Sequence, residues 1–253
     1  MAGNSTRPGA SVASGLLALL GAFDSGHRDL TLTELARRAD LPLATAYRLI
    51  AELVQWGALV RRPSGEYVVG RRLWDLGLLA PVQSGLRLVA SPFLHDIYGA
   101  TLATVHLAVR DGLQVLYIDR LSGHASVPVV SQIGSRLPLH ATGVGKVLLA
   151  YAPDDVQAHV LASLTRVTPY TITQPGRLRE QIRRVRREGF AQTSEEMSLG
   201  ASSVAVPIRA PDETVVAALG IVVPQLKRDR SRLVAALQVA AHGIGRSIPS
   251  APR

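Results

Sequence analysis

The sequence contains no cysteine, so disulfide bonds and thiolate metal sites are excluded. It also lacks an apolar run of the ~18–20 uninterrupted residues that a membrane-spanning helix needs. Residues 1–15 contain one arginine and no apolar core followed by a cleavage pattern, so we do not expect a secretory signal. These absences predict a cytoplasmic protein with no membrane partner.

Basic residues outnumber acidic ones, with 28 Lys and Arg against 19 Asp and Glu and a formal net charge of +9. Such a balance fits a polyanionic partner, although many basic proteins bind no nucleic acid. Residues 1–82 contain 9 Lys and Arg against 7 Asp and Glu, and residues 83–253 contain 19 against 12. Net charge therefore does not locate a DNA-binding surface, and local sequence patterns must do so.

Three short helices and a basic hairpin are predicted near the N-terminus. Apolar residues recur at helical spacing in residues 11–23 and 44–56. A shorter helix is predicted within residues 31–40, with Thr33 as its N-cap. Two β-prone runs then flank Pro63-Ser64-Gly65, which indicates a hairpin. This order of elements is that of a winged helix-turn-helix.

The rest of the chain has a mixed pattern of helices and strands. Two alternating apolar segments around Arg110-Asp111-Gly112 predict a β-hairpin, and residues 127–134 predict a further short strand. The sequence therefore predicts an α+β protein in three parts: a winged helix-turn-helix over residues 8–72, a helical linker over residues 73–83 and a second domain over residues 84–250.

The third predicted helix carries the candidate DNA-reading side chains. In a helix-turn-helix, the second helix of the pair enters the major groove and presents its first turns to base edges and phosphates. The hydroxyls of Thr45 and Tyr47 and the guanidinium of Arg48 suit such contacts, and two hairpin arginines suit neighbouring phosphates or the minor groove. The candidate DNA-binding residues are Thr33, Leu43, Ala44, Thr45, Tyr47, Arg48, Arg61 and Arg62.

A second interpretation of this segment stays open. Three small helices also form structural or protein-docking modules, and the low net charge of residues 1–82 is compatible with that role. DNA binding is favoured because arginines occur in both the recognition helix and the hairpin. The apolar start of that helix, at Leu43 and Ala44, predicts modest base readout and a dependence on dimerisation for specificity.

The stretch HATGVGKVLLA at residues 140–150 has the look of a phosphate-binding loop. A Walker-type loop needs Gly, four residues and then Gly-Lys-Ser/Thr. Here His140 takes the first position and Val147 the hydroxyl position, so we do not expect a nucleotide enzyme. The stretch instead predicts a glycine turn that opens a helix, where free backbone N–H groups suit a small anion. Lys146 is predicted to be structural or peripheral.

No other catalytic or metal-binding set is apparent. The seven histidines include no i, i+4 pair and no compact cluster with carboxylates. Ser202-Ser203 lacks the Gly-x-Ser-x-Gly elbow of hydrolases, and Glu195-Glu196 is interpreted as a solvated or helix-capping pair. The six arginines between Arg177 and Arg187 are placed on the solvent face of an amphipathic helix. We expect no metal, no cofactor and no enzymatic activity.

Several separate motifs resemble those of one known family. They are SVASGLLALLGAF, LTLTELARRADLPLATAYRLIAELVQWGALVRR, GEYVVG, GSRLPLHATGVGKVLLA and EGFAQTSEEMSLGASSVAVPI, in this order. Together they extend over nearly the whole chain, and they resemble the IclR family of transcriptional regulators. The resemblance implies a winged helix-turn-helix followed by an α/β, GAF-like effector-binding domain with a curved, mainly antiparallel sheet.

The resemblance also implies where a small-molecule effector binds. In the family, the effector lies against the curved sheet, near the glycine turn, the loop after VPVVSQ, the segment TSEEMSLGASS and the last strand. Carried over residue by residue, the implied effector-binding residues are Ser126, Val129, Gly143, Val144, Thr193, Ala201, Ser203, Gly220 and Val222.

Four of these positions depart from the form of the family that binds two- and three-carbon oxoacids. That form has an acidic residue, a cysteine and two serines where this sequence has Thr193, Ser203, Gly220 and Val222. Smaller and less polar side chains predict a roomier, more apolar cavity. We therefore expect a larger or aromatic carboxylate, or a lactone-like metabolite, rather than glyoxylate or pyruvate.

The function predicted from these observations is a sequence-specific DNA-binding regulator, in the form of a repressor, controlled by a small organic or aromatic acid. The implied partners are a pseudo-palindromic operator in double-stranded DNA and further copies of the chain, as a dimer or a dimer of dimers. The alternative is a small-molecule-binding protein or enzyme whose winged helix serves only assembly.

Overall fold

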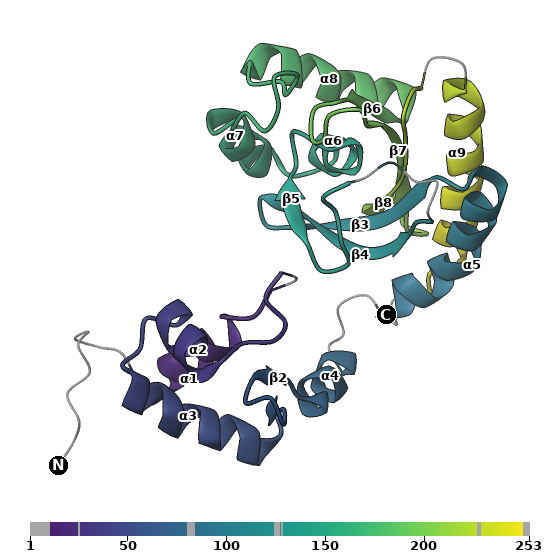
Figure 1. Cartoon of the computed structure of the whole chain (residues 1–253). Helices are drawn as coiled ribbons and strands as arrows, with labels where there is room; N and C mark the ends of the chain where they lie inside the picture. The colour runs from purple at the N-terminus through teal and green to yellow at the C-terminus, as the bar shows by residue number, and fades with distance from the viewer. Residues whose placement is uncertain are drawn as a thin grey trace. The chain divides into compact units, whose positions relative to one another are not determined.

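Two units divide the chain, Met1–Val82 and Gln83–Arg253, and Figure 1 labels their helices and strands. The computed structural model describes residues 11–24, 26–79, 84–123, 127, 129–226 and 229–249. The predicted linker, residues 73–83, begins inside a helix of the first unit, and its last four residues lie outside the described ones.

The first unit is a winged helix-turn-helix. Its buried side chains come from all three of its first helices and from both strands, for example Leu19, Leu35, Leu49 and Leu59. The elements are α1 (Val12–Leu20), α2 (Leu32–Arg38), α3 (Leu43–Trp56), the antiparallel strands β1 (Leu59–Arg61) and β2 (Tyr67–Val69), and α4 (Arg71–Leu78). The predicted architecture of this part is confirmed.

The N-cap of α2 is Thr31, so the prediction of Thr33 was wrong. The Thr31 hydroxyl accepts a hydrogen bond from the Glu34 backbone N–H at 3.3 Å, and the Glu34 carboxylate accepts one from the Thr31 backbone N–H at 2.8 Å. This reciprocal capping box satisfies two donors at once. Thr33 has the right residue type for a cap, but it lacks a glutamate three positions later.

The second unit is built on one six-stranded sheet in which every pairing is antiparallel. The strand order is β5-β4-β3-β8-β7-β6, so the hairpins β3–β4 and β7–β8 meet at the sheet centre. The strands are β3 (Thr104–Asp111), β4 (Gln114–Leu121), β5 (Arg136–Pro138), β6 (Ala191–Ser194), β7 (Ser202–Arg209) and β8 (Val215–Val223). The helices are α5 (Ser84–Thr101), α6 (Gly143–Ala150), α7 (Asp154–Ala162), α8 (Pro175–Glu188) and α9 (Arg230–Ser247).

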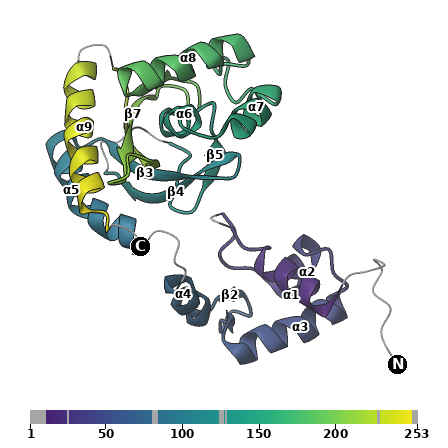
Figure 2. The same ribbon diagram turned by 180° about the vertical axis from the view of Figure 1, so that it is seen from behind.

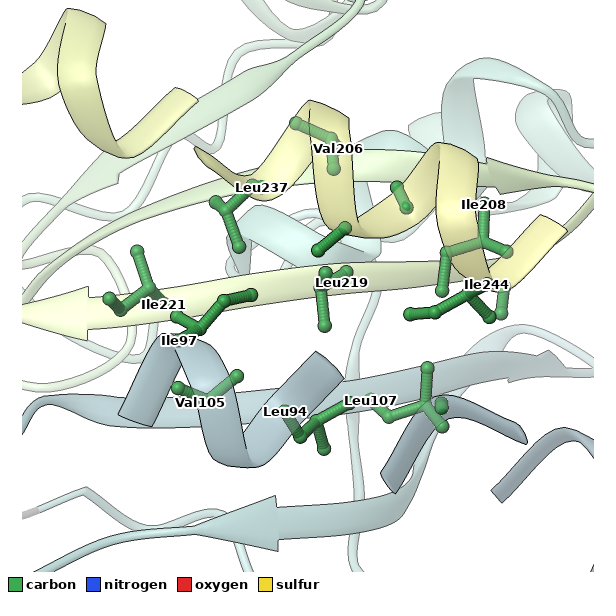
Figure 3. Close-up of a cluster of buried hydrophobic side chains, with 14 of the residues drawn as sticks. Leu94, Ile97, Val105, Leu107, Val206, Ile208, Leu219, Ile221, Leu237 and Ile244 are labelled. Atoms are coloured by element: carbon green, nitrogen blue, oxygen red, sulfur yellow. The ribbon is translucent and has the colours of Figure 1, made fainter. Parts of the chain in front are cut away.

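Alternate residues of the strands pack on opposite faces of this sheet. On the outer face, Val105 and Leu107 of β3 join Leu219 and Ile221 of β8 in a cluster with side chains of α5 and α9, which Figure 3 shows in close-up. The opposite face curls around α6, with α7 and α8 beyond it (Figure 2). The expected curved, mainly antiparallel sheet is therefore confirmed.

Small residues on the inner face let α6 approach the strands closely. A Cβ atom on Gly220 would lie 2.7 Å from the Val144 side chain of α6, and Ala205 stands opposite Gly220 on β7. A Cβ on Gly145 would collide with the backbone of Leu139. The glycines of the turn thus serve close packing, which explains why they look like a phosphate loop without its other residues.

The short strand predicted over residues 127–134 was wrong as far as this segment is described, because those residues form no strand. The strand that pairs with β4 at this edge of the sheet is β5, which begins at Arg136, two residues after the predicted strand. In the segment, Val130 is exposed while Ser131 is buried, and Gly134 turns the chain with a φ of 84°. The β-branched side chains here cover a cavity instead of forming a ladder.

Candidate functional site

The exposed face of α3 presents most of the predicted DNA-binding side chains. Tyr47 is 61% exposed, and Leu43, Ala44 and Arg48 are also exposed, whereas Thr45 is half-buried. Positions 43 and 47, like 44 and 48, are one helical turn apart, so these side chains share one face. The buried positions Ala46, Leu49 and Ile50 face the core, as their spacing predicted.

The two wing arginines and Thr33 have different surroundings. The Arg62 guanidinium lies 2.7 Å from the Asp29 carboxylate, and the Arg61 guanidinium lies 5.9 Å from the centre of the Tyr67 ring. Thr33 is exposed on α2. Arg62 is therefore held in place by a carboxylate, so a phosphate would have to share or replace that partner.

A cavity of about 490 Å³, part of it open to solvent, lies between the inner face of the sheet and the N-terminus of α6. Its wall contains eight predicted effector-binding residues, namely Val129, Gly143, Val144, Thr193, Ala201, Ser203, Gly220 and Val222. The ninth, Ser126, lies outside the described residues.

The start of α6 provides hydrogen-bond donors at the cavity. Thr142 is the N-cap, and its hydroxyl accepts from the Gly145 backbone N–H at 3.1 Å. Within the described part of the chain, the backbone N–H groups of Gly143 and Val144 have no hydrogen-bond partner. Both residues line the cavity, and free N–H groups at a helix N-terminus attract anions.

Two hydroxyls stand beside this helix start. The Thr193 and Ser203 hydroxyl oxygens are 2.6 Å apart, on the paired strands β6 and β7. A Cβ on Gly143 would lie 2.5 Å from the Ser203 hydroxyl, so the hydroxyl pair and the helix start are adjacent. Together they form a polar end suited to a carboxylate, with both N–H and O–H donors.

A second polar group lies across the cavity, on β3 and in the segment after β4, and sequence reasoning missed it. Ser131 and the Nε2 atom of His106 form a hydrogen bond of 2.8 Å, and the His106 ring meets Tyr117 edge to face, with 4.9 Å between ring centres. The signal was present as a lone histidine within the mainly apolar run that forms β3. The other lining residues not predicted are Val130, Leu137, Thr142, Met197, Ser198, Ser202, Val204 and Ile221.

Two family models match the chain: Bacterial transcriptional regulator IclR C-terminal, over residues 81–246, and IclR helix-turn-helix domain, over residues 16–63. The chain belongs to the IclR family of transcriptional regulators.

Solved and curated IclR-family members are similar over most of their length. The crystal structure of an IclR homolog from Microbacterium hydrocarbonoxydans, complexed with 4-hydroxybenzoate, superposes with a TM-score of 0.90 at 34% identity, covering 94% of this chain and 99% of that one. The HTH-type transcriptional regulator XynR of Escherichia coli (strain K12) is 30% identical, over 81% of this chain and 82% of its own. KdgR of the same organism is 30% identical, over 86% and 85%.

This IclR-family chain is therefore a DNA-binding transcriptional regulator controlled by a small molecule, and not an enzyme. The alternative of an enzyme with a winged helix used only for assembly is wrong. No helix in the described part of the chain is long and apolar enough to cross a membrane. The described residues also contain no cluster of three or more His, Asp or Glu that could hold a metal ion.

Lys146 and Glu196 of this IclR-family regulator form a buried ion pair behind the cavity. The Lys146 ammonium donates to the Glu196 carboxylate at 2.5 Å and to the Gln181 side-chain oxygen at 2.6 Å. Lys146 is 1% exposed and Glu196 6%. The interpretation of Glu195-Glu196 as a solvated or capping pair was therefore wrong for Glu196, and Lys146 is not peripheral.

This ion pair joins three elements of the effector-binding unit. Lys146 belongs to α6, Gln181 to α8, and Glu196 to the segment that contributes Met197 and Ser198 to the cavity wall. Burial lowers the pKa of Lys146 and raises that of Glu196, while their mutual attraction opposes both shifts. The pair therefore holds the cavity wall against the helix whose N-terminus opens into it.

His106 gives the effector-binding unit a predictable pH dependence. Burial, helped by the charge of Arg120, lowers the pKa of His106 from 6.5 to about 3. Between these values the unfolded chain binds a proton that the folded chain does not, so the free energy of unfolding falls as the pH falls, by up to about 1.4 kcal/mol per pH unit. Denaturation monitored by circular dichroism at pH 7, 6, 5 and 4 measures this slope.

His106→Gln is expected to reduce the slope below pH 6.5 without removing it, because burial also lowers the pKa of His140. Equal slopes for the wild type and His106→Gln would contradict the prediction.

Proposed function

We propose that this regulator binds a pseudo-palindromic operator as a homodimer or a dimer of dimers, acts in the cytoplasm as a repressor, and releases the operator when a larger or aromatic carboxylate fills the cavity. The observation that carries the proposal is the cavity itself, where an anion-attracting helix N-terminus and a hydroxyl pair adjoin an otherwise largely apolar wall. The 4-hydroxybenzoate in the complex of the Microbacterium homolog supports this ligand class.

Apolar side chains on the surface of the first unit support self-association. Trp74 is 60%, Leu76 46% and Leu79 77% exposed, all on or just after α4. Clustered exposed side chains of this size mark protein interfaces more often than free surface. A dimer presents two copies of α3, and two-fold symmetry in the protein requires two-fold symmetry in the operator.

The proposed DNA contacts are the exposed face of α3, made by Leu43, Ala44, Thr45, Tyr47 and Arg48, together with Arg61 and Arg62 of the wing and Thr33 of α2. The small and apolar residues at the start of α3 favour close approach, while the arginines supply phosphate or guanine contacts. An effector changes operator affinity only through the coupling between the two units, typically about 1–3 kcal/mol. A gel-shift assay with the intergenic DNA beside the gene, with and without ligand, tests both parts of the proposal.

The ligand class is tested by thermal denaturation and calorimetry with a panel of acids. Glyoxylate, pyruvate, benzoate and 4-hydroxybenzoate differ in size while sharing a carboxylate. Aromatic acids at 100 times their Kd are expected to stabilise the effector-binding unit by about 2.7 kcal/mol. Tight binding of glyoxylate with no response to the aromatic acids would overturn the proposed class and leave the DNA-binding function intact.

A further inference from the structure

We propose that His106 and Ser131 form a second polar subsite, which accepts an uncharged hydrogen-bonding group at the far end of the effector. The effector would then be an aromatic carboxylate that carries a ring hydroxyl opposite its carboxylate. This inference rests on the proposed effector class, and it assigns roles to two residues that are not among the effector-binding residues implied by the family motifs.

The two polar ends of the cavity are separated by two strand spacings. His106 of β3 is paired with Gly220 of β8, and Gly220 with Ala205 of β7, in one row across the inner face. Ser203 is two residues from Ala205 on the same face of β7, and it pairs with Thr193 of β6. Since neighbouring strands are about 4.8 Å apart and two residues of a strand extend about 7 Å, the positions of His106 and Ser203 are separated by roughly 12 Å.

One six-membered ring suits this separation. Hydrogen bonds of about 2.8 Å at both ends leave roughly 6 Å, which matches a planar ring with polar groups on opposite sides. Gly220 and Ala205 have no side chain or a small one, so they leave space for a ring in the middle of the row. Val144 and Val222 provide apolar contacts there. The cavity therefore combines an apolar middle with a polar group at each end.

The far subsite is suited to an uncharged group. Among the described residues that line the cavity there is no Asp, Glu, Lys or Arg. Burial lowers the pKa of His106 to about 3, so its imidazole is neutral at physiological pH. Arg120 of β4 is opposite His106 in the sheet, but it is not part of the cavity wall. A second carboxylate would therefore be buried beside a neutral imidazole, which is costly without a direct partner.

A hydroxyl group matches the hydrogen-bonding capacity of this end. A neutral imidazole has one donor and one acceptor nitrogen, and a serine hydroxyl donates one hydrogen bond and accepts up to two. Only the Nε2 atom of His106 is engaged, with Ser131, within the described part of the structure. Tyr117 packs against the imidazole edge to face and fixes its orientation. A ligand hydroxyl can therefore join the His106–Ser131 hydrogen bond without breaking it.

The test uses the full-length chain and isothermal calorimetry with four acids: benzoate, 4-hydroxybenzoate, 4-methylbenzoate and terephthalate. The methyl compound has nearly the shape of the hydroxyl compound but cannot form the hydrogen bond. For the wild type, we expect 4-hydroxybenzoate to bind about tenfold or more tightly than 4-methylbenzoate, because sites built around a hydrogen bond reject analogues that lack it. Terephthalate should bind more weakly than 4-hydroxybenzoate.

In Ser131→Ala and His106→Leu, the ratio of the two affinities should fall towards one while 4-methylbenzoate binding is retained. Retained binding of 4-methylbenzoate shows that each variant is folded. If His106→Leu is unstable, Ser131→Ala alone tests the subsite. Ser231→Ala changes an exposed serine of α9 that does not line the cavity, and it should leave the ratio unchanged. A wild-type ratio near one, an unchanged ratio in both variants, or tighter binding of terephthalate overturns the inference alone. Failure of all four acids to bind overturns the proposed ligand class together with it.

Discussion

Lys146→Met is expected to lower the free energy of unfolding of the effector-binding unit by about 3–5 kcal/mol, because it leaves the Glu196 carboxylate buried without its cation. The loss is measured by urea denaturation followed by circular dichroism. Both tryptophans, Trp56 and Trp74, belong to the first unit, so tryptophan fluorescence in the same experiment reports that unit separately. The fluorescence transition should stay near its wild-type midpoint.

A matched control and a double variant isolate the buried charge as the cause. Arg184→Met removes the partner of Glu188 from an exposed i, i+4 pair on α8, and such pairs contribute about 0.3–0.5 kcal/mol. Lys146→Met combined with Glu196→Leu should recover most of the lost stability, since replacing both partners of a buried pair is often nearly neutral. A single variant as stable as the wild type would contradict the assignment.

Arg48→Ala is expected to abolish the gel shift with operator DNA at physiological salt. Arg48 is exposed on α3, one turn after Ala44, and loss of a base-contacting arginine costs about 1–3 kcal/mol for each copy bound. Because Arg48 is not buried, the thermal transition of the first unit should be unchanged. The measurement is a titrated gel shift, or fluorescence anisotropy, at several salt concentrations.

Two further variants make the result for Arg48 specific. Arg48→Lys keeps the charge but loses the bidentate geometry, so it should bind with reduced discrimination between operator and competitor DNA. Arg187→Ala, at an exposed position of α8 in the other unit, removes the same charge and should leave the shift intact. An unchanged shift for Arg48→Ala would count against α3 as the recognition helix.

Apolar periodicity and the residue types at helix ends and turns were sufficient to predict most of the helices and the two hairpins named in the sequence analysis. The apolar stripe of α3 ends at Gly57, which adopts the left-handed conformation with a φ of 84°. The amphipathic α8 buries Leu178, Ile182 and Val185, as its spacing predicted. These features depend on residues close together in the chain, so periodicity and end signals suffice to find them.

Local rules failed where a distant partner decides the outcome. Residues 129–134 have β-prone composition, but Val129, Val130 and Ser131 line the cavity, and Ser131 forms a hydrogen bond with His106 of β3. A glutamate next to another glutamate is typical of a solvated surface, yet Glu196 is buried. It is stabilised there by an ion pair with Lys146, fifty residues earlier in the chain. Neither pairing leaves a periodic signal in the sequence.

The amino-acid sequence by itself determined the winged helix-turn-helix, the family, and the residues of α3 that face outward, because motif spacing and apolar periodicity encode them. It also pointed, through family motifs, to eight described residues that surround one cavity. Only the tertiary structure decided that this cavity has a polar group at each end and a buried ion pair behind it. The two polar ends arise from strand register, which brings His106, Gly220 and Ala205 into one row although they are up to 114 residues apart in the chain.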